Sequence, residues 1–348
     1  MRTFVGFLLL LSSVIGLAQQ PASANQPRVL EFTQADAYAR YRYTDNQFGV
    51  VTNDDLQYRF TLRPRINVPR TGTYFGSRVE TGSNFSSSWS NSGIGRSPKE
   101  WVLNAKTIFI GQRIGKHTEV EVGAMDVEQG AGTEATYTDL DAYTEGYRLR
   151  LVDLHHSYAP SRVVLHIGYL GDFTSMNAFS RLYRLGEVNY VQVLAEKNFE
   201  KWAVASLQFD RLRGLNLLRG ASRFNLPDHW WINEARIDAV GRTNINPTAG
   251  WALHLTKTKG RAGKFNPGLY YSHLPIGVYQ VGTQQALLNG DVYGLGKRIG
   301  VTSKYQVTKA FDISALVTRR LDSDPFGFRW RAQIVGRYQF ASVLKRLP

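Results

Sequence analysis

The chain of 348 residues contains no cysteine. Disulfide bonds, thiol catalysis and thiolate metal sites are therefore excluded, as is a lipid anchor on an N-terminal cysteine. Proline is sparse, with 12 residues, and few stretches carry the period of an amphipathic helix. Glycine contributes 32 residues, and aromatic side chains make up 12% of the chain. This composition favours many strands and tight turns over an α/β fold.

Long apolar runs are confined to the N-terminus. Arg2, the apolar run 4–17 and small residues at 16–18 and 22–24 predict a secretory signal peptide cleaved after residue 18 or 24. Residues 25–348 then form a single exported domain. No later segment approaches the length of a spanning apolar helix. A soluble periplasmic all-β carbohydrate-binding protein is an alternative that these facts alone leave open.

The formal net charge is +14, but the basic residues are spread along the chain and alternate with apolar ones. Nucleic-acid-binding proteins concentrate their positive charge, so no nucleic-acid partner is predicted. No phosphate-loop or dinucleotide motif is present, and no cofactor is predicted. The carboxylates that could bind Ca²⁺ are interpreted as solvated loop charge, and three histidines are too scattered to form a metal site. These residues are Asp126, Glu128, Asp139, Asp141, Glu145, His166, His254 and His273.

The main pattern is alternation of apolar and polar residues at every second position. In 328–340 the even positions are apolar or glycine, whereas the odd positions carry mostly Arg and Gln. Residues 298–307 and 249–258 alternate in the same way. Alternation predicts strands with one apolar and one polar face. In a membrane barrel the apolar face meets lipid and the polar face lines the lumen, the reverse of a soluble sandwich.

Connections of two kinds separate these segments. Short ones near 68–73, 113–117, 159–162, 197–201, 241–247, 275–276 and 308–310 interleave with longer ones near 46–55, 86–100, 128–146, 172–186, 211–229, 259–266, 284–293 and 320–327. This predicts a transmembrane antiparallel up-and-down β-barrel of about 16 strands (about 14–18), with short periplasmic turns and longer outer loops. Aromatic residues fit interfacial girdles at the strand ends, namely Trp101, Trp202, Trp230, Trp231, Tyr338 and Phe340.

Several segments resemble a bacterial outer-membrane porin family. The stretches 103–111 and 118–123, joined by a short turn, are similar to a porin hairpin, and 127–151 is similar to porins of the alginate-export type. The resemblance implies passive passage of small hydrophilic solutes across a Gram-negative outer membrane, without naming alginate as the solute. It leaves a homotrimer and a monomer open.

The C-terminus also resembles a signal for the barrel-assembly machinery, through Gly336, Tyr338 and Phe340. It departs from that pattern because residues 341–348 follow the aromatic residue, and because the spacing from glycine to the aromatic residue is one position short.

In a barrel, parity along each strand decides which residues face the lumen. The polar parity predicts a pore lining of Arg40, Arg42, Arg59, Arg63, Arg78, Arg148, Arg150, Arg329, Arg331, Arg337, Glu119 and Glu121. Because closure places the last strand beside the first, most of these arginines should form one basic wall. An arginine-lined pore favours anions, since the guanidinium keeps its charge and binds carboxylate or phosphate. The alternative is that arginines and glutamates pair across the lumen and merely fill it.

A hydrolase in the barrel wall is the second functional alternative. His155 and Ser157 share one strand face and could act as base and nucleophile. The outer-membrane phospholipase pattern continues beyond its serine with Asn-Gly, whereas Tyr158 and Ala159 follow here. The prediction is therefore a channel and not an enzyme.

Overall fold

The computed structural model describes residues 29–82, 102–133, 135–136, 142–154, 159–170, 177–258, 265–275, 278, 294–322 and 328–340, and the backbone of 94–95, 280–281 and 284–285. Its architecture is a closed antiparallel barrel of 16 long strands. They are β1 (Leu30–Asn46), β2 (Val51–Asn67), β3 (Thr73–Thr81), β5 (Leu103–Ile114), β6 (Thr118–Asp126), β7 (Tyr143–Leu151), β8 (Arg162–Tyr169), β9 (Tyr190–Phe199), β10 (Ala203–Leu212), β11 (Leu215–Asn225), β12 (Glu234–Arg242), β13 (Thr248–Thr256), β14 (Phe265–Leu274), β17 (Gly296–Gln306), β18 (Phe311–Arg320) and β19 (Phe328–Gln339).

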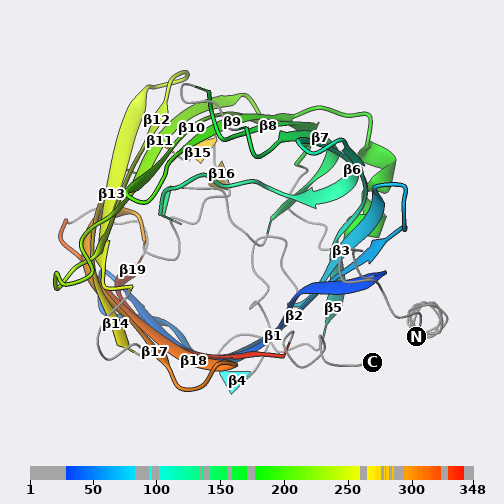
Figure 1. Ribbon diagram of the computed structural model, residues 1–348. Coiled ribbons are helices and arrows are strands. Elements are labelled where there is room, and N and C mark those ends of the chain that lie inside the picture. The colour runs from blue at the N-terminus through cyan, green and yellow to red at the C-terminus, as the bar shows by residue number, and fades with distance from the viewer. Residues whose placement is uncertain are drawn as a thin grey trace.

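The barrel closes between its first and last strands. β1 pairs with β2 on one side and with β19 on the other, and every other long strand pairs with its sequence neighbours (Figure 1). A two-residue strand β4 (Ile94–Gly95) adds to β2, while β15 (Gln280–Val281) and β16 (Gln284–Gln285) pair separately. The predicted all-β barrel of about 16 strands is confirmed.

The described residues include two 3₁₀ turns, η1 (Ala178–Ser180) and η2 (Leu182–Arg184), and Val278 also has 3₁₀ conformation. None of the helices described is long and apolar enough to cross a membrane.

The two faces of the barrel wall differ in polarity, as the alternation predicted. Large apolar side chains are exposed on the outward face, including Leu207 on β10, Ile237 on β12 and Val301 on β17. Their neighbours one position along each strand point inward and are polar and buried, such as Gln208 and Asp238. A barrel with an apolar outside and a polar inside is the inverse of a soluble sandwich.

The long connections lie mostly at one end of the barrel. We call this the loop end; β6, β8 and β14 end there, and their connections to the next long strands are the longer ones. The opposite end, the turn end, carries 68–72, 115–117, 200–202 and 307–310, together with both ends of the described chain. A cluster of buried apolar residues, among them Leu170, Tyr190, Leu212 and Leu274, lies near the loop end.

The predicted long loop 211–229 was wrong. β10 and β11 are joined by the two-residue turn Arg213–Gly214, in which both residues have positive φ (48° and 87°). Such a turn matches the twist of a hairpin. The alternation of apolar and polar residues did not predict β11. Its inner face begins with Leu215 and Leu217, so its two faces differ little in polarity.

The predicted strand after 275–276 was wrong as well. β14 ends at Leu274, and the next strand of the barrel, β17, begins at Gly296. The missed strand β11 and the extra predicted strand cancel, so the predicted number of strands was right. The connections between those two places, however, were assigned to the wrong ends of the barrel. The turn 243–247, predicted as periplasmic, lies at the loop end, whereas β13 ends and β14 begins at the turn end.

Candidate functional site: the barrel interior

A segment after β6 folds into the barrel and follows its inner wall. Gln192 on β9 donates its amide to the Glu128 carbonyl (2.9 Å), and the Ala131 amide donates to the Ser206 hydroxyl on β10 (2.9 Å). Farther along, the Thr133 hydroxyl donates to Asp238 on β12 (2.7 Å). We call residues 127–133 and 135–136 the internal segment. It narrows the interior from the side of β7 to β12.

The far end of the internal segment is held by a second group of contacts. The Thr136 hydroxyl also donates to Asp238, and Arg219 on β11 donates its Nε to the Thr136 carbonyl (2.6 Å). These side chains are almost fully buried. Hydrogen bonds at both ends therefore fix the path of the segment along the wall.

Ion pairs anchor the near end of the internal segment. The Glu128 carboxylate pairs with Arg148 (3.3 Å), Arg150 and Arg162 (3.3 Å), from β7 and β8. Glu121 on β6 pairs with Arg148 (2.5 Å) and Arg150 (3.0 Å). The register explains the pairing, because Glu121 lies directly opposite Arg148 on the neighbouring strand. The predicted Arg148, Arg150, Glu119 and Glu121 thus form one network that fixes the segment.

The network should resist acid. Burial raises the pKa of Glu128, but the charges of Arg150, Arg148 and Arg162 outweigh burial and hold its pKa at about 2, below the ordinary 4.5. A lowered pKa stabilises the fold fully above the unfolded value, and this contribution is lost as pH falls from about 4.5 to about 2. We expect the unfolding free energy of the wild type to exceed that of Glu128→Gln most above about pH 5.5, one unit above the ordinary pKa of 4.5. A difference that stays constant down to pH 2 would contradict this origin.

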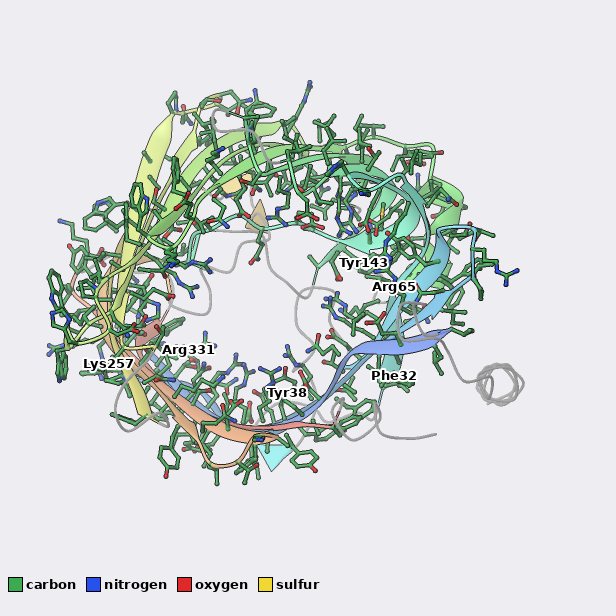
Figure 2. The ribbon with its side chains drawn as sticks, viewed as in Figure 1. Phe32, Tyr38, Arg65, Tyr143, Lys257 and Arg331 are labelled. Carbon is green, nitrogen blue, oxygen red and sulfur yellow. The ribbon has the colours of Figure 1, made fainter. Side chains whose placement is uncertain are left out.

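A basic wall lies opposite the internal segment, on β19, β1 and β2. Its inner-face arginines are Arg40, Arg42, Arg59, Arg63, Arg65, Arg331 and Arg337. The carboxylates on the inner face of the same strands are fewer, namely Glu31, Asp36 and Asp55. Figure 2 shows Tyr38 and Arg331 on the inside of the ring. The side of the interior not covered by the internal segment is therefore rich in positive charge.

Aromatic and amide side chains hold the guanidinium groups of this wall in place. Tyr38 lies between Arg59, at 4.3 Å from its ring centre, and Arg337, at 5.7 Å. Arg40 donates from Nε (3.0 Å) and Nη2 (2.6 Å) to the Gln57 side chain. Neither an aromatic ring nor an amide carries a net charge, so these contacts orient a guanidinium without adding negative charge to the wall.

The predicted pore lining separates into two groups in space. Arg63 and Arg78 both bind Asp126 (2.9 and 2.8 Å), so these members of the predicted wall are held by a carboxylate at the end of β6. Arg337 pairs with Asp36 (3.1 Å). Arg329, near the start of β19, pairs with Asp45 near the end of β1 (2.8 Å). Arginine–carboxylate pairs are therefore concentrated around β3 to β8, whereas arginines outnumber carboxylates on the inner face of β19, β1 and β2.

Several inward residues escaped the prediction. Arg65 has the parity of Arg59 and Arg63 on β2, so the pattern could have found it. Arg298 and Arg320 lie opposite each other on β17 and β18, buried on the inner face. The roles of Glu128 and Arg219 had no signal in the sequence, because they depend on where the internal segment lies.

The remaining predicted sites carry no reactive cluster in the part of the chain that is described. His155 and Ser157 lie outside the described residues, as do Asp139, Asp141 and Trp101. Within the described ranges no group of three or more His, Asp or Glu could hold a metal ion. His166 contacts the Thr144 hydroxyl (2.7 Å) and His254 contacts the Thr302 hydroxyl (3.0 Å).

The fold and its interior define a class: a closed 16-strand antiparallel barrel with a polar inside, an apolar outside and an internal segment. No family model matches the chain, and no curated protein does. The likeness of 127–151 to alginate-export porins therefore stays a prediction.

Solved porin structures share this fold. Salmonella typhi OmpF, in complex with daunomycin, superposes with a TM-score of 0.58 at 12% identity, over 89% of this chain and 97% of that one. An engineered variant of the Rh. blastica porin superposes with a TM-score of 0.52 at 11% identity, over 89% and 100% of the two chains. At these identities the likeness concerns the fold.

Proposed function

We propose that this protein is an outer-membrane channel through which small hydrophilic solutes pass by diffusion, with a preference for anions. The single observation that carries the proposal is the polarity of the barrel: a charged, hydrogen-bonded inside and an apolar outside. Only a closed barrel satisfies every backbone group of its strands within a bilayer. The shared fold with OmpF and the Rh. blastica porin supports this placement.

The anion preference rests on the two unequal sides of the interior. On β6 to β8 the arginines pair with Glu119, Glu121 and Glu128, and their charges largely cancel. On β19, β1 and β2 the arginines outnumber the carboxylates. A passing anion is attracted to the second side, since rings of Arg or Lys select anions in other pores. Outer-membrane lipids, the barrel-assembly machinery and small hydrophilic or anionic solutes are the partners that this proposal implies. A monomer and a homotrimer are both compatible with it.

The zero-current potential in a planar bilayer under a KCl gradient tests both parts. The folded protein should conduct in discrete steps, and the sign of the potential should correspond to chloride preference. Charge reversal at Arg331, a member of the basic wall, should weaken that preference. Heat-modifiable gel mobility confirms that the protein tested is a folded barrel. Conductance with cation preference would contradict the role of the basic wall, and no conductance from folded protein would contradict the channel itself.

A further inference from the structure

A groove on the outer wall of the barrel arises from three rows of side chains. In register across β14, β17 and β18, the first row is Leu269, Val301 and Val317, the second is Pro267, Ser303 and Ala315, and the third is Phe265, Tyr305 and Ile313. The outer rows carry large side chains, whereas the middle row is small. The wall is therefore hollowed along the middle row, and the structure contains a groove of about 290 Å³ there.

The groove is apolar and opens to the outside of the barrel. Leu255 on β13 extends the first row, and Trp231 and Ile232 line the groove from the connection between β11 and β12. Val301 and Leu269 are about half exposed although they are aliphatic. Three strand spacings of about 4.8 Å separate β13 from β18, so the middle row spans about 14 Å. This shape fits a single extended hydrocarbon chain.

One end of the groove carries a cation and two exposed indoles. The backbone amide of Lys257 donates to the Pro267 carbonyl (2.9 Å). Lys257, which directly follows β13, therefore lies beside Pro267 and extends the middle row by one residue. Its ammonium donates to the Trp230 carbonyl (2.9 Å), next to Trp231. Figure 2 shows Lys257 on the outside of the ring. An ammonium carries three donors, and only one is needed for that carbonyl.

We propose that this groove is a binding site for one anionic phospholipid, with an acyl chain along the middle row and the phosphate at Lys257. The inference rests on the proposed membrane placement. It is supported by charge complementarity and by the position of the site at the turn end. There Trp230, Trp231 and Phe265 are half exposed or more, as aromatic residues at a headgroup boundary are. The site is separate from the basic wall of the interior.

The test is lipid retention by the purified barrel, measured by native mass spectrometry with phosphatidylglycerol as the probe. Wild type should retain one lipid per chain after washing with detergent. Ala315→Phe fills the middle row and should lower retention at least about tenfold, the scale of a lost apolar anchor. Lys257→Ala should lower it about fivefold, the effect of one basic residue at an anionic lipid surface. Ser303→Phe fills the same row and serves if Ala315→Phe fails to fold.

Matched controls separate this site from general lipid adhesion. Ala39→Phe adds the same ring to an exposed outward position on β1, and Lys201→Ala removes a charge from another turn at the same end. Both should retain lipid as wild type does. Equal retention by the groove variants and the wild type would overturn the proposal, and so would equal loss in Ala39→Phe. Loss of an oligomer with lipid retention unchanged would assign the groove to a second copy of the chain.

The outcome is independent of the channel test. Lipid retention is measured on folded barrel whether or not it conducts, and the groove variants should keep the conductance of the wild type. If the folded protein does not conduct, the lipid measurement still tests the groove. If the wild type retains no lipid, the conductance measurement still tests the channel.

Discussion

Neutralising Arg59 lowers the chloride preference of the channel in one step, and reversing its charge lowers it again. Arg59 lies on the basic wall and is held over Tyr38. A unit charge about 4 Å from a passing ion contributes about 1 kcal/mol in a water-like environment. The chloride-to-potassium permeability ratio should therefore fall about fivefold in Arg59→Gln and by a similar further factor in Arg59→Glu. Zero-current potentials under a KCl gradient give the ratio, and low salt enlarges the effect.

A matched pair of variants tests whether position matters. Lys309 is exposed in the turn between β17 and β18, outside the interior. Lys309→Gln and Lys309→Glu should leave the permeability ratio nearly unchanged, because bulk salt screens a charge at the turn end. If the two series gave equal shifts, overall charge would decide selectivity and the basic wall would have no special part in it.

Removal of the Glu121 carboxylate should destabilise the barrel more than removal of almost any surface charge. Glu121 is 1% exposed, pairs with Arg148 and Arg150, and accepts the Tyr74 hydroxyl (2.7 Å). Glu121→Ala removes a hydrogen-bond partner from the buried Arg148 guanidinium and from the buried Tyr74 hydroxyl. Breaking a buried pair from one side costs about 3–5 kcal/mol. Denaturant unfolding of the barrel in lipid vesicles, followed by tryptophan fluorescence, measures the change.

The comparison for this variant is an ion pair on the surface. Glu187 pairs with Arg184, and both side chains are more than one-third exposed. Glu187→Ala should cost less than about 1 kcal/mol, the usual value of an exposed pair. If Glu121→Ala and Glu187→Ala lowered the unfolding free energy equally, the network on β6 and β7 would not be a structural anchor.

The strand pattern was predictable where one face of a strand is apolar and the other is charged. β17 and β19 have this character, and both were found. β11 was missed because Leu215 and Leu217 face inward, against the apolar cluster at the loop end. Its outward face also carries a leucine, Leu218. Local alternation fails where tertiary packing makes the inner face apolar too.

The candidate pore lining was predictable in orientation and not in pairing. Parity placed Arg148 and Glu121 on the inner face, and the structure adds that they are opposite each other. Asp126 and Glu128 were interpreted as solvated loop charge, which was wrong. Both lie where the chain enters the barrel, and both bind arginines. No periodicity reports the path of a connection, so these partners were invisible in the sequence.

The sequence by itself determined that this chain makes strands with one apolar and one charged face, in sufficient number to close a barrel. Side-chain parity in an extended chain is fixed locally, so it is readable without any tertiary information. Only the tertiary structure decided which arginines are neutralised. Closure brings β19 beside β1, and the internal segment brings Glu128 to Arg148, Arg150 and Arg162. Charge pairing depends on distances between residues far apart in the chain, and those distances exist only once the barrel is closed.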